Sequence, residues 1–260
     1  RKPDSSIVVG MGLLQQGSAD AFISAGSTGA VMAASRLFLG MVPGVERPTV
    51  GTMFPTAGSP VLVVDAGANI ETRPYHLLQF AHLGSVYMRD LLALEAPRVG
   101  LLNVGEEASK GDARTVATHR LLQEDGELNF VGNIEGDRIL EGTCDVLVCD
   151  GFVGNVLLKF YESVAGFISG VLESHLDPET HAAGLKEVYR TVDYAEYGGA
   201  PLLGVNGVSI ICHGGSSARA IKNAIRTAVT CIESGMVADL ASELGPTSRT
   251  ARVWRKIRRR

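Results

Sequence analysis

The sequence predicts an α/β fold with three layers, in which helices cover both faces of a mostly parallel sheet. Short continuous apolar runs recur along the chain, and Val61–Val64 and Val146–Cys149 are the clearest examples. Each run leads into a small polar loop rich in glycine, and a helical stretch follows the loop. Strands that are buried on both faces read as continuous apolar runs, and their alternation with helices is typical of parallel sheets. The 260 residues can bury one large core.

The predicted elements follow one another in a regular order. Strands are expected at Ala21–Ser24, Val61–Val64, Val99–Leu102, Leu128–Val131, Val146–Cys149 and Val208–Cys212. Helices are expected over Ala30–Leu39, from Pro74 to about Leu92, from about Asp112, after Asn155, and in a last long stretch that reaches about Glu233. Because the loops after parallel strands share one edge of a sheet, the polar residues of these loops should meet in one cleft.

Composition and charge exclude several classes of protein. Hydrophobic residues make up 45% of the chain and charged residues 20%, which is an ordinary globular composition. The formal net charge of −4 argues against a nucleic-acid binder. The arginine-rich stretch from Arg252 to Arg260, which contains Trp254, is expected to be solvated.

The cysteines and the apolar stretches indicate a reduced protein without a membrane span. The four cysteines show no CxxC pair and no zinc spacing, so we expect free thiols and no metal. Cys149 lies in an apolar run and is expected to be buried and structural. The most apolar stretch, Val156–Leu172, is interrupted by Lys159 and Glu162, and a membrane-spanning helix is not expected there.

The loop Ser24–Gly29 is the sharpest local motif. Its two glycines let backbone N–H groups converge, its hydroxyl groups add donors, and a helix begins at once, as in chains that hold a phosphate or a carboxylate. An ordinary strand-to-helix turn with a Ser or Thr cap is the alternative. Val8–Gly12 resembles the start of a dinucleotide-binding turn, but Gln15 stands where the third glycine belongs, so we reject a nicotinamide cofactor.

Other polar residues follow the remaining strands. Asp65 and Asp150 each end an apolar run, and they either orient a ligand or cap the next turn. Asn69, Asn103, Asn133 and Asn155 are neutral donors suited to an oxyanion, and each type is also common in turns. Lys110 shares a loop with Glu106 and Glu107, and His213 ends the last strand.

With these loops assembled, the chain resembles the phosphate acyltransferase family of bacterial lipid synthesis (acyl-ACP:phosphate transacylase). The stretches that carry the resemblance are Ser24–Ala30, Val64–Asn69, Leu102–Glu107, Phe130–Asp137, Cys149–Asn155 and Gly198–Gly204, in family order. The family opens with a strand and an Asp-Ala-Met-Gly-Gly-Asp loop that this sequence does not show. We therefore expect residues 1–260 to form a single catalytic domain that lacks the first part of the family fold, with a helical excursion over residues 156–197.

The resemblance implies a fold like that of isocitrate and isopropylmalate dehydrogenases and transfer of a long-chain acyl group from acyl carrier protein to inorganic phosphate. It also implies a homodimer, no cofactor, a cytoplasmic location with peripheral contact to the inner membrane face, and contact with a downstream membrane acyltransferase. Phosphate binding is then assigned to Ser24, Gly26, Ser27, Thr28 and Gly29, and catalytic roles to Asn69, Lys110, Asn133, Asp150, Asn155 and His213.

Two other functions remain open at this point. A phosphotransacylase that acts on short acyl-CoA would need the same chemistry in the cleft. A non-catalytic acyl or phosphate sensor could keep the fold without turnover.

Overall fold

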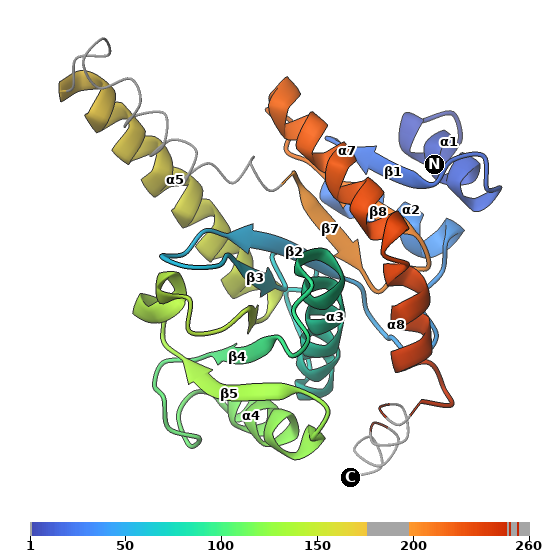
Figure 1. Ribbon diagram of the computed structural model, residues 1–260. Helices are drawn as coiled ribbons and strands as arrows, with labels where there is room; N and C mark the ends of the chain where they lie inside the picture. The colour runs from blue at the N-terminus through green and yellow to red at the C-terminus, as the bar shows by residue number, and fades with distance from the viewer. Residues whose placement is uncertain (1, 176–197, 249, 251–253, 255–260) are drawn as a thin grey trace.

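The computed structural model describes residues 2–175, 198–248, 250 and 254 (Figure 1). They form an eight-stranded sheet with the strand order β1-β8-β7-β2-β3-β6-β4-β5. The strands are β1 (Ala21–Ser24), β2 (Thr49–Phe54), β3 (Val61–Val64), β4 (Arg98–Leu102), β5 (Asn129–Ile134), β6 (Val146–Val148), β7 (Ala200–Leu203) and β8 (Val208–Ile211). Four of the neighbouring pairs are parallel, namely β1–β8, β3–β6, β6–β4 and β4–β5. The predicted α/β fold with a mostly parallel sheet is confirmed.

Two strands that the sequence analysis did not predict join the halves of the sheet. β7 is antiparallel to β8, β2 is antiparallel to β7, and β3 is antiparallel to β2. After these three reversals, β1 and β8 run opposite to β3, β6, β4 and β5. The expectation that six strand ends share one edge of a single parallel sheet is therefore wrong, because it took no account of antiparallel connecting strands.

Helices cover both faces of this sheet. They are α1 (Ser6–Gln15), α2 (Thr28–Phe38), α3 (Pro74–Leu92), α4 (Ala113–Asp125), the 3-10 helix η1 (Gly136–Glu141), α5 (Gly151–His175), α7 (Ala218–Glu233) and α8 (Met236–Leu244). On one face α3 packs against α4, α7 and α8 and covers the largest apolar cluster. Side chains alternate along each strand, so Leu62 and Val64 of β3 point to this cluster, while Val61 and Val63 point to the opposite face.

The opposite face is covered by two separate groups of helices. α1 and α2 pack over the part of the sheet that holds Leu202 and Ile211. α5 packs over β3 and extends away from the sheet (Figure 1). Between the two groups, none of the described helices covers part of the surface of β2 and β7, and the cleft described below lies there.

The structure bears on three expectations from the sequence. Val8–Gly12 lies inside α1, which agrees with the rejection of a dinucleotide-binding turn at this stretch. Trp254 is buried, with its ring edge-on to those of Tyr75 and His82 at centroid distances of 5.6 and 5.4 Å, so this part of the carboxyl-terminal stretch is not solvated. The helix expected after Asn155 already begins at Gly151, and residues 176–197 of the predicted excursion lie outside the described residues.

The cysteines of the chain, Cys144, Cys149, Cys212 and Cys231, are free and buried. Burial raises the pKa of the Cys149 thiol, whose Sγ lies 3.6 Å from the carbonyl oxygen of Asp65. A thiol in this environment is a poor nucleophile, as expected from the sequence. Among the described helices, none is both long and apolar enough to cross a membrane.

Replacing Asp145 by asparagine should destabilise the protein by about 2 kcal/mol at pH 7, because Asp145 accepts hydrogen bonds from a charged partner. Arg98 donates to it from Nε and Nη2 at 3.1 and 2.8 Å, and from its backbone N–H at 2.7 Å. Burial alone would raise the pKa of Asp145, but the bonds from Arg98 outweigh it and hold the pKa below its ordinary value of 3.8.

A carboxyl group with a lowered pKa stabilises the folded state above its unfolded pKa, and this contribution is lost as the pH falls through the folded pKa. The difference in unfolding free energy between wild type and Asp145→Asn should therefore shrink below about pH 4. Urea unfolding at pH 7 and at pH 3 measures it. An equal difference at both pH values would contradict the assignment.

Candidate active site

A cleft of about 360 Å³ lies where β2 and β7 connect the two halves of the sheet. Its walls come from loops that follow strands of both parallel groups. Thr28 follows β1 and His213 follows β8, whereas Gly67 follows β3 and Asn155 lies in the helix after β6. Carboxyl-terminal loops of both groups thus meet in one cleft, although the two groups run in opposite directions.

The loop Ser24–Gly29 reaches this cleft at its carboxyl end. The Ser24 hydroxyl oxygen accepts a hydrogen bond from the backbone N–H of Gly26 at 3.1 Å, which shapes the turn. Ser27 occupies the N-cap position of α2, but its side chain forms no capping bond, and Thr28 lines the cleft. The first N–H groups of a helix have no partner within the helix and carry partial positive charge, so this end of α2 favours an anion.

His213 lies beside this loop. The backbone N–H of Cys212 donates to the carbonyl oxygen of Ser24 at 2.8 Å, which joins the ends of β8 and β1. The exposed imidazole accepts a hydrogen bond at Nδ1 from the backbone N–H of Gly215 at 3.1 Å. In the neutral ring the proton must then reside on Nε2, which makes Nε2 a donor.

Asp65 and Asn69 build the opposite wall rather than supply free groups. The carboxylate of the fully buried Asp65 accepts from the backbone N–H groups of Val50, Gly67, Ala68 and Asn69 at 2.6 to 3.2 Å. Burial is the larger effect and raises the pKa of Asp65, although these hydrogen bonds oppose it. Asn69 Nδ2 donates to the carbonyl oxygen of Pro48 at 2.7 Å and to Asp65 at 2.8 Å, which uses both of its amide hydrogens.

Asp150 caps α5 and forms an ion pair. Its Oδ1 accepts from the backbone N–H groups of Phe152 and Val153 at 2.9 and 3.0 Å. Its Oδ2 accepts from Nη2 of Arg114 at 2.7 Å. The capping alternative is thus what the structure shows for Asp150, and its pairing with Arg114 was not foreseen, because the two residues are distant in sequence.

Asn133 and Lys110 lie on a neighbouring part of the sheet edge, outside the lining of the cleft. Asn133 Nδ2 donates to the carbonyl oxygen of Glu107 at 2.9 Å, and its Oδ1 lies 2.9 Å from Nδ1 of His119. Asn103 Nδ2 donates to the carbonyl oxygen of Lys110 at 3.0 Å. These asparagines hold the loop that carries the exposed Lys110 side chain.

The cleft is also lined by polar residues that the sequence analysis did not select, among them Lys159, Ser216 and Thr52. Lys159 lies in α5, and its ammonium group is 2.7 Å from Oε2 of Glu162. In the sequence, these two charges interrupt an apolar stretch, and this interruption could have indicated Lys159 as a site residue. Ser216 follows His213. Thr52 of β2 is 7% exposed, and its Oγ1 is buried without a hydrogen-bond partner among the described residues. No signal pointed to Thr52, because β2 itself was not predicted.

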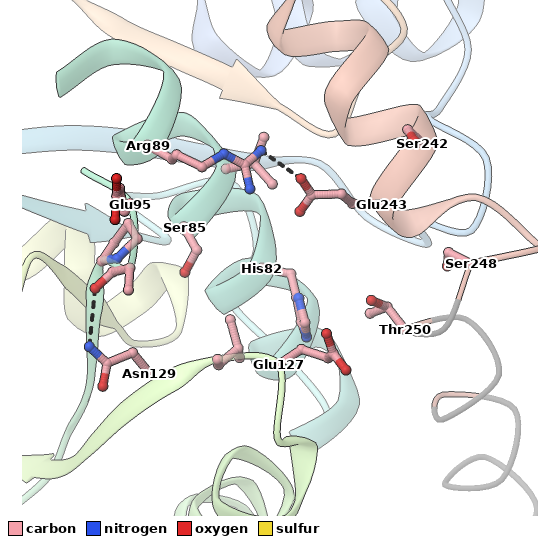
Figure 2. A pocket seen from close by; sticks show the side chains of 14 residues that line it. His82, Ser85, Arg89, Glu95, Glu127, Asn129, Ser242, Glu243, Ser248 and Thr250 are labelled. Carbon is pink, nitrogen blue, oxygen red and sulfur yellow. Dashed lines mark hydrogen bonds and ion pairs between the residues drawn. The ribbon is translucent and has the colours of Figure 1, made fainter. Parts of the chain in front are cut away.

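A larger cavity of about 640 Å³ lies elsewhere and suits an anion less well (Figure 2). It is lined by residues just before β4 and β5, such as Pro97 and Leu128, at the amino ends of these strands. Glu95, Glu127 and Glu243 contribute carboxylates to it, and its Arg89 is paired with Glu243 at 2.6 Å. Ligands of α/β sheets bind at the carboxyl ends of strands, so the smaller cleft is the better candidate for the active site.

Comparisons with known proteins agree with this fold. A family model described as "Fatty acid synthesis protein" matches residues 1–239. The phosphate acyltransferase of Desulforamulus reducens is 50% identical over 251 residues, covering 94% of this chain and 75% of that protein. The phosphate acyltransferase of Desulfitobacterium hafniense DCB-2 is 50% identical over 253 residues, with the same coverage.

Two solved structures resemble the chain at low sequence identity. A phosphotransacetylase from Streptococcus pyogenes has a TM-score of 0.60 at 17% identity, covering 86% of this chain and 67% of that one. A branched-chain phosphotransacylase from Enterococcus faecalis V583 has a TM-score of 0.56 at 15% identity, covering 87% and 80%. Such identities show the fold alone.

The fold defines an α/β protein with the fold of phosphotransacylases, and its cleft is the candidate active site. The chain belongs to the phosphate acyltransferase family, a family of acyl-transferring enzymes, as the resemblance indicated.

Proposed function

We propose that this protein transfers a long-chain fatty acyl group from acyl carrier protein to inorganic phosphate and releases acyl phosphate for phospholipid synthesis. One observation carries the proposal: the amino end of α2, with the Ser24–Gly29 loop, faces a cleft in a member of the phosphate acyltransferase family. Residues 1–260 act as one catalytic domain in this proposal.

The reaction needs positioning and charge stabilisation more than a covalent intermediate. A phosphate oxygen attacks the thioester carbonyl carbon, a C–O bond forms, the C–S bond breaks, and the thiolate of the carrier leaves and takes up a proton. Phosphate is already an anionic nucleophile. Holding the two reactants in line contributes roughly 7–11 kcal/mol, and one donor to the developing oxyanion contributes about 3–4 kcal/mol.

The candidate residues divide into groups that meet the reactants and groups that position them. Ser27, Thr28 and the N–H groups of the loop bind phosphate in this proposal, and His213 Nε2 donates to the departing thiolate. Asn155 and the unpartnered Thr52 hydroxyl supply donors to the oxyanion. Asn69, Asn133 and Asp150 are positioning residues, because their polar atoms are already engaged. Lys110 reaches the reactants only if its loop approaches the cleft.

Replacing Ser27 and Thr28 together by alanine should raise the KM for phosphate about 10- to 100-fold, because each hydroxyl donates to a charged ligand. Stability should change little, since Ser27 makes no capping bond. Initial rates at varied phosphate concentration measure the effect. The double variant Thr230→Ala and Ser234→Ala is the control, because both hydroxyls donate to carbonyl oxygens of α7, away from the cleft. An unchanged phosphate dependence would remove the loop from the site.

The choice of acyl donor separates the proposal from its alternatives. Acyl phosphate formation from palmitoyl-acyl carrier protein supports it. Turnover of acetyl-CoA alone would favour a short-chain phosphotransacylase. Phosphate binding without turnover of either donor would favour a sensor.

We also propose that the protein is a cytoplasmic homodimer that contacts the inner membrane face and a membrane acyltransferase that uses its product. Exposed apolar side chains of α5, among them Phe160 and Phe167, supply a surface for such contacts. Light scattering tests the dimer, and sedimentation with anionic vesicles tests the membrane contact. A monomer that stays in the supernatant would contradict both.

A further inference from the structure

A second, apolar groove of about 470 Å³ runs along the other side of α5. Its walls are the end of β2 with the residues that follow it, the 3-10 helix η1, and one face of α5. Phe54, Ile139 and Ala165 represent these three walls. The groove shares no lining residue with the cleft in which the acyl transfer is proposed to occur.

The groove adjoins the cleft along two elements. In β2, Thr52 and Met53 line the cleft, and the next residue, Phe54, lines the groove. In α5, Leu158 lines the cleft, and its neighbour Leu157 lines the groove. Residues two apart in a strand point to the same face, so the Thr52 hydroxyl and the Phe54 ring lie in line along one face of β2.

The lining of the groove is suited to a hydrocarbon. Among the residues that line it, none carries a charged side chain. Its one threonine, Thr56, is engaged: the hydroxyl donates to the carbonyl oxygen of Ser59 at 2.7 Å and accepts from the N–H of Gly58 at 3.0 Å. Among the groove residues, the rings of Phe54 and Tyr161 stack with their centroids 5.2 Å apart. Ligand pockets of about 300–1,000 Å³ with apolar walls are typical of small-molecule sites.

We propose that this groove binds the hydrocarbon tail of the acyl group whose thioester reacts in the cleft. The inference rests on the proposed acyl transfer and adds to it the site that selects chain length. The tail leaves the cleft beside Leu158 and enters the groove between Phe54 and Leu157. Because burial of each methylene favours binding about fourfold, affinity should rise with chain length until the groove is filled.

The test fills the groove from either wall and compares chain lengths. Ala165→Trp blocks it from α5, and Ala57→Trp blocks it from the loop after β2, so one variant can replace the other if the first does not fold. Ser163→Trp adds the same bulk to α5 outside both cavities and is the matched control. We expect kcat/KM for a sixteen-carbon acyl donor to fall at least tenfold in the blocked variants, while that for a four-carbon donor stays within about twofold. The tenfold fall corresponds to the loss of about two buried methylenes.

Binding of butyl phosphate and dodecyl phosphate, measured by calorimetry, separates this inference from the proposed function. A preference for dodecyl phosphate that the blocked variants lose would support the groove even if no turnover is found. Turnover with equal losses for short and long donors would overturn the groove and leave the function standing. A change of oligomeric state in Ala165→Trp, without a change in chain-length preference, would assign the groove to a second copy of the chain and overturn the inference.

Discussion

The Gly154→Ala variant should lose about 3 kcal/mol or more of its free energy of unfolding, because a side chain at this position cannot be accommodated. An added Cβ would lie within van der Waals overlap of the carbonyl oxygen of Asp65, at 1.8 Å, and 3.1 Å from Sγ of Cys149. Both neighbours lie in the buried contact between α5 and the sheet. Relief requires α5 to move away from β3, and this movement displaces Asn155 and Lys159 from the cleft.

Gly166→Ala is the matched control for this prediction. Gly166 lies in the same helix, and an added Cβ would meet no atom within 4 Å among the described residues. Alanine favours a helix over glycine by about 1 kcal/mol, so this variant should be as stable as the wild type or more so. Urea unfolding followed by circular dichroism compares the two variants. Equal losses of unfolding free energy in the two variants would show that the close approach of α5 to Asp65 is not what excludes a side chain at residue 154.

The Thr52→Val variant should be more stable than the wild type and far less active. Valine has the shape of threonine and removes a buried hydroxyl that has no partner, which relieves an unfavourable burial of about 1 kcal/mol. If this hydroxyl donates to the oxyanion in the cleft, its loss should lower kcat roughly a hundredfold. Opposite changes in stability and activity are the signature of a group kept for function.

Thr49→Val is the control for Thr52. Thr49 lies in the same strand, is fully buried, and its Oγ1 also lacks a partner among the described residues, but it does not line the cleft. Its replacement should raise stability without changing the rate. Thermal unfolding and initial rates measure both variants. Unchanged activity in Thr52→Val would exclude the hydroxyl from catalysis.

Local patterns predicted the elements that bury apolar residues on both sides. The predicted strand Val61–Val64 and the helix from Pro74 to Leu92 match the observed β3 and α3. β2 escaped prediction because Thr49, Gly51 and Thr52 interrupt its apolar pattern, and β7 because four residues with a proline carry little periodic signal.

The candidate site likewise contains parts that local sequence patterns indicated and parts that they missed. The Ser24–Gly29 loop was predicted because its glycines, hydroxyls and following helix are adjacent in sequence. The pairing of Arg114 with Asp150 and the unpartnered hydroxyl of Thr52 depend on residues that are distant in sequence, so no local pattern could indicate them.

The sequence by itself determined the α/β class and the family, and it indicated the candidate loop Ser24–Gly29, because each depends on residues that are adjacent in sequence. Only the tertiary structure decided which polar groups remain available. Asn69 and Asn133 look like donors in the sequence, but the folded chain uses their amides to hold Pro48, Asp65 and the loop at Glu107. A buried polar group must find a partner, and which groups become buried depends on contacts between distant segments. The same contacts set the apolar groove beside the cleft.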